Sequence, residues 1–204
     1  MAIAVTGGRA EFCSGKTEPS GRTGALNGQV GFIISNRRVV PAESATVYVL
    51  YSRRMEDRAA WFEGKPTFWH GNNLNTAGGQ FRERLNSLLA GNKDLKRLEK
   101  RIRQDARPED VNQMGAYYLR SVDEALTWVH SYLTKHPDRG WEMKTVTPDG
   151  RGFWSAEGLA PGGYDVVVRG KLLQYDTDWE GEVDLPPDTT ISLPLTRPRF
   201  LSHE

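Results

Sequence analysis

Residues 147–168 constrain the fold more than any other stretch, because they combine a turn, a strand, a tight corner and a second strand. Proline, aspartate and glycine at Pro148–Gly150 supply the fixed φ and the positive φ that such a turn needs. An aromatic strand begins at Phe153, and Pro161–Gly163 then reverses the chain. Apolar residues alternate along the strand that follows, so this stretch predicts a β structure with one buried face.

The same alternation recurs along the chain and predicts seven strands, the number expected for a Greek-key sandwich. These strands are Gln29–Ile34, Thr46–Tyr51, Trp141–Val146, Gly152–Ala156, Tyr164–Arg169, Trp179–Asp184 and Thr190–Leu195. The sequence therefore predicts a mainly β fold, a seven-stranded antiparallel Greek-key β-sandwich of the transthyretin type.

Between the second and third of these strands the apolar period changes from two to about 3.5 residues, which is typical of helices. Apolar residues follow helical spacing over residues 81–102, with a break at Gly91-Asn92. A second helix is expected to start at Arg107–Asp110, where a proline and two acids occupy the first turn. Its apolar seam runs from Val111 to Leu133 and stops before His136-Pro137. We therefore expect an αα-hairpin inserted into the sandwich.

Two blocks of this sequence resemble a known family. The first holds Gly28-Gln29-Val30 and Pro41–Val49, and the second is the 147–168 stretch. Their glycines, prolines and alternating apolar residues resemble the pattern of the carboxypeptidase regulatory-like domain, a small carbohydrate-binding-like β-sandwich. In that family the blocks are close together, whereas here residues 52–140 separate them. The resemblance implies a non-catalytic binding or structural module of the kind found in bacterial cell envelopes.

Composition narrows the functional classes. The chain has 204 residues and a net charge of +1, from 27 basic and 26 acidic residues, so no global field favours nucleic acid. It has no apolar run of 18 residues, and we expect no transmembrane segment. The single cysteine, Cys13, cannot form an intramolecular disulfide. No signal peptide is visible around Met1–Val5, although the resemblance implies the cell envelope or secretion.

The sequence matches two ligand-binding motifs only in part. Residues 10–17 match a loose phosphate-binding loop, but Pro19 and Gly21 follow where the helix of such a loop would begin. Acids alternate over Asp176–Asp184 as in the first half of a calcium loop, but Pro187 occupies the position of the bidentate glutamate. We therefore predict no catalytic, cofactor-binding or metal-binding residues and no enzyme activity. An enzyme with an unrecognised site stays an alternative.

The first predicted helix carries a basic stripe. Lys93, Lys96, Lys100 and Arg103 recur at helical spacing, opposite an apolar stripe. Such a face can bind acidic partners, although it is more often a solvated surface. These four residues form one part of the predicted ligand surface.

The other part of that surface lies in an irregular, polar stretch. Trp61 and Trp69, with His70 and Asn72, can form a platform on which a sugar stacks, or can pack the helices onto the sandwich. The first possibility predicts a carbohydrate-binding module that uses exposed tryptophans.

The predicted organisation has three parts. Residues 1–27 form a flexible leader, residues 28–52 and 140–200 form the sandwich, and residues 53–139 form the inserted loop and helical hairpin. Because so large an insertion into a compact sandwich is usually functional, we expect it to recognise a protein or peptide partner. A glycan is the alternative ligand.

Overall fold

The computed structural model describes residues 23–33, 39–54, 75–199 and 201–202. The strands are β1 (Gly24–Gln29), β2 (Gly31–Ile33), β3 (Val39–Pro41), β4 (Glu43–Arg54), β5 (Met143–Val146), β6 (Phe153–Leu159), β7 (Gly162–Leu172), β8 (Tyr175–Leu185), β9 (Thr190–Ser192) and β10 (Leu201–Ser202). The helices are α2 (Ala77–Gly91), α3 (Lys93–Gln104), α4 (Pro108–Lys135) and the short 3₁₀ helix η3 (Pro137–Glu142). The fold is therefore β-rich with a helical part.

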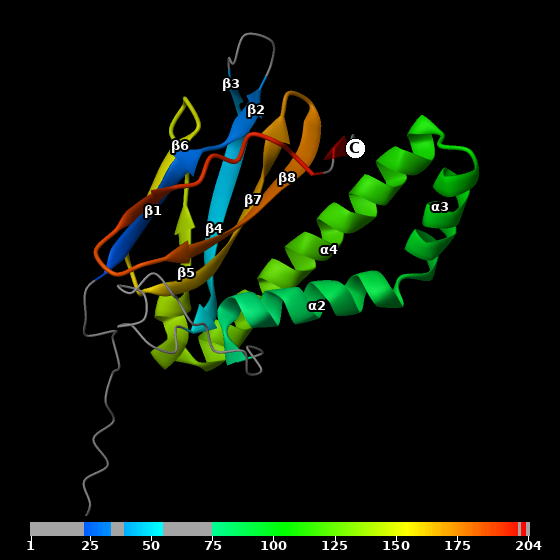
Figure 1. Ribbon diagram of the computed structural model, residues 1–204. Coiled ribbons are helices and arrows are strands. Elements are labelled where there is room, and N and C mark those ends of the chain that lie inside the picture. The colour runs from blue at the N-terminus through cyan, green and yellow to red at the C-terminus, as the bar shows by residue number, and fades with distance from the viewer. Residues whose placement is uncertain (1–22, 34–38, 55–74, 200, 203–204) are drawn as a thin grey trace, which may run out of the picture.

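The strands form two sheets and a small ribbon (Figure 1). One sheet has the order β6-β1-β9, and the other has the order β10-β8-β7-β4-β5. The larger sheet is antiparallel throughout, whereas β1 and β9 of the smaller sheet run parallel. β2 and β3 pair with each other as a ribbon.

The first core lies between the two sheets. Alternate residues of β4 and β7 point into it, among them Val47 and Val166, and Leu26 enters from β1. Trp179 is fully buried there, and its indole N–H donates a 2.9 Å hydrogen bond to the backbone carbonyl of Gly31. This bond satisfies the one polar atom of a large apolar side chain, so the tryptophan can occupy the centre of the core.

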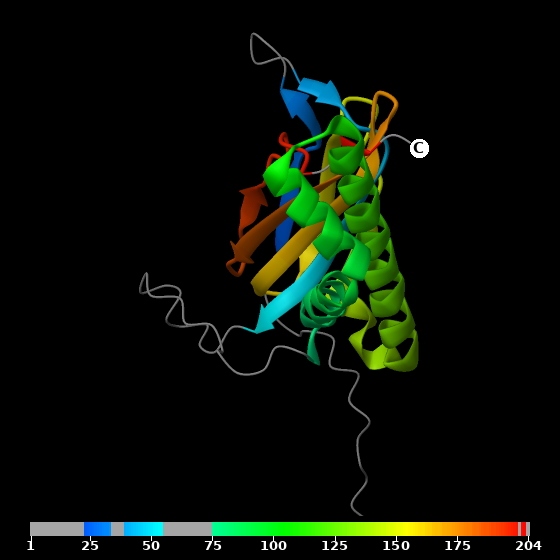
Figure 2. The same cartoon turned by 90° about the vertical axis from the view of Figure 1, so that its right-hand side faces the viewer.

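The second core lies on the opposite face of the larger sheet, under the helices (Figure 2). Leu50 of β4 and Val167 of β7 meet Phe81 of α2, while Val122 and Val129 of α4 are fully buried. β7 is therefore buried on both faces, which explains its continuous apolar run.

A polar clasp closes the inserted segment where it leaves and rejoins the sheet. Thr76 caps α2 by accepting from the Gly79 N–H at 3.1 Å, and its hydroxyl donates to the carbonyl of Ser52 on β4. Glu142, which precedes β5 and is 2% exposed, accepts the Ala77 N–H at 2.8 Å. A carboxylate at the N-terminus of a helix is favourable because it faces the positive end of the helix dipole.

The structure differs from the sequence prediction in three respects. The described residues form sheets of three and five strands with one parallel pair, not a purely antiparallel set of seven. The inserted hairpin contains three helices, because Asn92 ends α2 and caps a separate α3 by accepting the Asp94 and Leu95 N–H groups. Residues 24–27, assigned to the leader, belong to β1.

Candidate functional site

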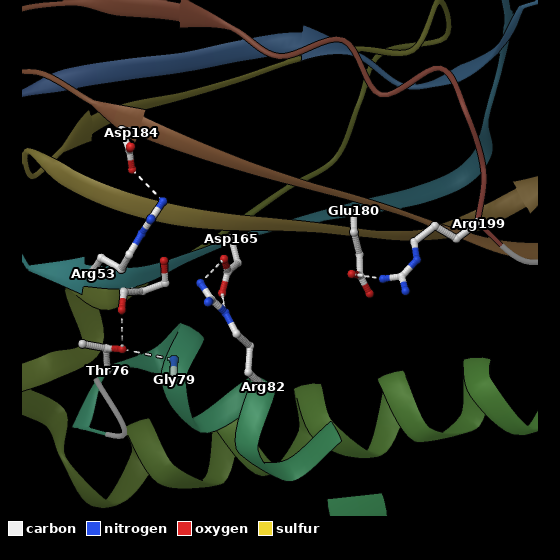
Figure 3. Close-up of polar contacts among 9 residues, drawn as sticks. Arg53, Thr76, Gly79, Arg82, Asp165, Glu180, Asp184 and Arg199 are labelled. Atoms are coloured by element: carbon white, nitrogen blue, oxygen red, sulfur yellow. Dashed lines mark hydrogen bonds and ion pairs between the residues drawn. The ribbon is translucent and has the colours of Figure 1, made fainter. Parts of the chain in front are cut away.

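A groove of about 550 Å³ lies between the inserted helices and the outer face of β7 and β8. Its walls come from α2, α4, the two strands and the segment before β10. The lining residues are Phe81, Arg82, Leu85, Asn86, Leu89, Tyr118, Asp165, Val166, Val167, Glu180, Gly181, Glu182 and Arg199. We call it the α2 groove, and Figure 3 shows four of its charged side chains, Arg82, Asp165, Glu180 and Arg199.

The alternation of β8 places its acids in this groove. Trp179, Val183 and Leu185 belong to the sandwich core, so Glu180 and Glu182 lie on the other face of the strand, toward the helices. Two of the acids that alternate over Asp176–Asp184 therefore form part of a groove wall.

The neighbouring strand adds a further carboxylate. Asp165 of β7 is the register partner of Glu182 and is buried. Like charges directly opposite one another destabilise a sheet unless a cation lies between or beside them.

Arg82 of α2 supplies that cation. Its guanidinium donates two hydrogen bonds of 2.6 Å to the Asp165 carboxylate, one to each oxygen (Figure 3). Burial raises the pKa of the Asp165 carboxyl above its ordinary value, although Arg82 acts to lower it. The pair is thus a bidentate link between the helix layer and the middle of the sheet.

A second charged group closes the far end of the groove. Arg199 forms an ion pair with Glu180, which also accepts a 2.9 Å hydrogen bond from the Tyr118 hydroxyl of α4. The Arg199 guanidinium lies 5.0 Å from the centre of the Tyr118 ring. Burial, followed by the charge of Glu180, raises the pKa of the Tyr118 phenol well above its ordinary value, so the phenol stays a hydrogen-bond donor.

A third ion pair lies beside the groove. Arg53 of β4 donates a 2.8 Å hydrogen bond to Asp184 of β8 (Figure 3). Burial raises the pKa of the Asp184 carboxyl, against the lowering effect of Arg53.

The groove can bind by charge, hydrogen bonding and apolar contact. Its lining holds three carboxylates and two guanidinium groups, with Phe81 and Leu85 as an apolar wall. Arg82 and Arg199 are paired with Asp165 and Glu180, and no described cation lies within ion-pair distance of Glu182. Within the described ranges, no three His, Cys, Asp or Glu side chains are grouped to hold a metal ion.

A second groove, of about 490 Å³, lies on the other side of α4, next to β5. Tyr48, Asp123, Leu126, Thr127, His130, Met143 and Thr145 line it. Asp123 is held by Arg169 of β7 through two hydrogen bonds of 2.6 and 3.0 Å. We call it the β5 groove.

The structure describes only part of the predicted ligand surface. Trp61, Trp69, His70 and Asn72 lie outside the described residues. The basic stripe of Lys93, Lys96, Lys100 and Arg103 is exposed on α3 and lines neither the α2 groove nor the β5 groove. Lys96 lines a smaller cavity of about 390 Å³, formed with Leu89, Leu95 and Met114 among others.

The groove residues Arg82, Tyr118, Asp165 and Arg199 were not among the predicted site residues. One signal was present, because Asp165 is a lone acid between Tyr164 and a run of valines. A charged residue in such a strand requires a partner, although the sequence does not identify Arg82 as that partner.

Comparison with known proteins gives only distant similarities. No family model and no curated protein matches the sequence. A solved structure from Pseudomonas aeruginosa, of a protein proposed to bind carbohydrate, is similar at 10% identity with a TM-score of 0.38, covering 86% of this chain and 89% of that chain. The pilus backbone protein RrgB of Streptococcus pneumoniae is similar at 7% identity with a TM-score of 0.30, covering 85% of this chain and 40% of that chain. Similarities of this size carry no argument about function.

The described helices include none that is both long and apolar enough to span a membrane.

Proposed function

We propose that this protein is a non-catalytic binding module that recognises a protein or peptide partner through the α2 groove. The observation that supports the proposal is the composition of this groove, in which an apolar wall of inserted helix faces a row of fixed charges on the sheet. Membership of the carboxypeptidase regulatory-like family is part of the proposal, and rests on the two sequence blocks described above.

The charges suggest what the partner presents. Ion pairs already hold Asp165 and Glu180, so their geometry is fixed before a partner arrives. Glu182 is exposed, and its carboxylate can accept an arginine or lysine from the partner. Leu89, which is half-buried on α2, supplies apolar area at the groove wall. A basic side chain next to an apolar one is therefore the expected recognition element.

The proposal is tested by blocking the groove. Asn86 lines the groove, is exposed, and can be replaced by tryptophan without removing any described contact. Ser87, its neighbour on α2, is also exposed but lies outside the groove, so Ser87→Trp is a matched control. Peptides are selected from a phage-displayed random library on the wild-type protein, and their affinities are measured by calorimetry.

The expected result is a set of selected peptides that bind wild type and Ser87→Trp equally and lose binding to Asn86→Trp. Peptides that bind all three proteins equally overturn the groove as the site. If no peptide is selected and a glycan array gives binding that Asn86→Trp abolishes, the module is a carbohydrate binder instead.

A further inference from the structure

β5 has an open edge. It pairs with β4 on one side, from Val47 opposite Val146 to Leu50 opposite Met143. On its other side no strand lies within the parts of the chain that the structure describes, because β5 ends the five-stranded sheet. Backbone N–H and C=O groups along such an edge are a ready template for another strand.

The lysine of this edge strand, Lys144, is held on the sandwich side of β5. Lysines on edge strands usually discourage pairing with a further strand. Lys144 instead forms a hydrogen bond through its ammonium group to the backbone carbonyl of Glu157 on β6, which belongs to the other sheet. Its charge is therefore held on the sandwich side of β5, away from the helix side where Met143 and Thr145 line the β5 groove.

The β5 groove lies between α4 and the helix-facing side of β4 and β5, next to this edge, and Tyr48 of β4 also lines it. Leu126 and Thr127 of α4 face Met143 and Thr145 of β5 across it. An added strand would present every second side chain toward α4, where Leu126 and Met143 offer apolar contact. A helix beside an open strand edge is the geometry in which peptides bind by strand addition.

We propose that the β5 groove binds an extended peptide segment as an additional strand on β5, with alternate apolar side chains directed toward α4. This site is separate from the α2 groove and goes beyond the proposed function, on which it does not rest. Backbone hydrogen bonds to Met143–Val146 supply affinity, and the apolar contact with Leu126 and Met143 selects β-branched or aliphatic residues.

An extended peptide fits this edge better than a second copy of the chain. When two identical edge strands pair antiparallel about a two-fold axis, the same face of both sheets carries the helices. The two α4 helices would then meet above the shared edge, because Asp123, Thr127 and His130 of α4 already border the groove. A single strand has no helix to place there.

The experiment uses the full chain and a fluorescein-labelled peptide of sequence Lys-Thr-Val-Thr-Val-Thr-Lys, followed by fluorescence polarisation. One N-methylated version carries methyl groups on the two valine amides, and the other carries them on the amides of the second and third threonines. Because successive N–H groups of a strand point to opposite edges, only one version keeps its donors toward β5. We expect that one methylated version binds like the parent and the other is weakened by about tenfold or more.

Protein variants test whether the peptide binds in the β5 groove. Thr127→Trp fills the groove and is expected to abolish binding, whereas Ser131→Trp adds the same side chain to an exposed position of α4 outside the groove and is expected to leave it unchanged. Thr145→Trp, from β5, is the second blocking variant if Thr127→Trp does not fold. Asn86→Trp, which blocks the α2 groove, is expected to have no effect here.

Three outcomes overturn the proposal. The first is that the parent peptide does not bind at millimolar concentration, and the second is that both methylated peptides bind equally. The third is a dimer in sedimentation velocity that Thr127→Trp dissociates, which would make a second copy the occupant of the edge.

Discussion

Arg82 and Asp165 join the inserted helices to the middle of the sheet through two hydrogen bonds of 2.6 Å. Asp165 is buried, while the Arg82 side chain is 42% exposed. The carboxylate therefore depends on this one guanidinium more than the guanidinium depends on it. Removal of Arg82 and removal of Asp165 should therefore destabilise the protein to different extents.

Replacing Arg82 by methionine should destabilise the protein more than replacing Asp165 by asparagine. Arg82→Met leaves a buried carboxylate without its cation, whereas Asp165→Asn leaves an arginine that water can reach. We expect losses in unfolding free energy of about 2–3 and about 1 kcal/mol, from urea denaturation. Arg97→Gln, in an exposed pair with Asp94, is the control and should change it by less than about 0.5 kcal/mol. Equal losses in all three variants would contradict the prediction.

Glu142 should make the protein less stable as the pH rises. Burial raises the pKa of its carboxyl above the ordinary value of 4.5, although Arg139 and the Ala77 N–H act to lower it. The folded protein therefore holds this proton more tightly than the unfolded chain does. The contribution of Glu142 is complete below the unfolded pKa and is lost as the pH passes through the folded pKa.

Glu142→Gln removes this titration and keeps an acceptor for the Ala77 N–H. We expect the difference in unfolding free energy, wild type minus variant, to decrease as the pH increases from 4.5 to 7. Urea denaturation at several pH values measures it. A difference that grows with pH would mean that Arg139, rather than burial, controls the group.

Two glycines of α2 should respond oppositely to alanine. At Gly78 a Cβ atom would lie 2.5 Å from the Ser52 Cβ and 2.8 Å from a carboxylate oxygen of Asp165, so Gly78→Ala should cost about 1–3 kcal/mol. At Gly91 nothing lies within 4 Å, so Gly91→Ala should stabilise by about 0.5 kcal/mol. Thermal denaturation compares the two, and stabilisation by Gly78→Ala would refute the close contact of α2 with β4.

The basic stripe of α3 should contribute nothing to folding. Lys93, Lys96, Lys100 and Arg103 are exposed and form no ion pair among the described residues. Replacing all four by glutamine, which has similar helix propensity, should change the melting temperature little. Circular dichroism at 222 nm measures the melting temperature. A large decrease in the melting temperature would show that the stripe packs against another part of the chain.

Much of the layout was readable from periodicity. The change of period after β4 predicted an inserted helical segment, and the break at Gly91-Asn92 lies where α2 ends and α3 begins. Pro108 at the start of α4 and His136 at its end also agree with their sequence signals. These features are local, so neighbouring residues encode them.

The rest depends on contacts between distant parts of the chain. β1 has the weak strand sequence GALNGQ, and it forms because β6 and β9 pair with it from far along the chain. The second core under the helices converts the outer face of β7 from a solvated surface into an interface. Arg82 and Asp165 are 83 residues apart, and only the packing of α2 over β7 brings them together.

The clasp formed by Ser52, Thr76 and Glu142 also marks where the inserted segment joins the sheet. The chain leaves along β4 and returns as β5, its direct neighbour, and Met143 at the start of β5 pairs with Leu50 of β4. The outer face of this sheet also needs an apolar cover, because Leu50 and Val167 pack against α2 and α4 in the second core. Any domain exchanged for the helices at this junction would therefore need termini that reach β4 and β5 and an apolar face that covers the outer side of the sheet.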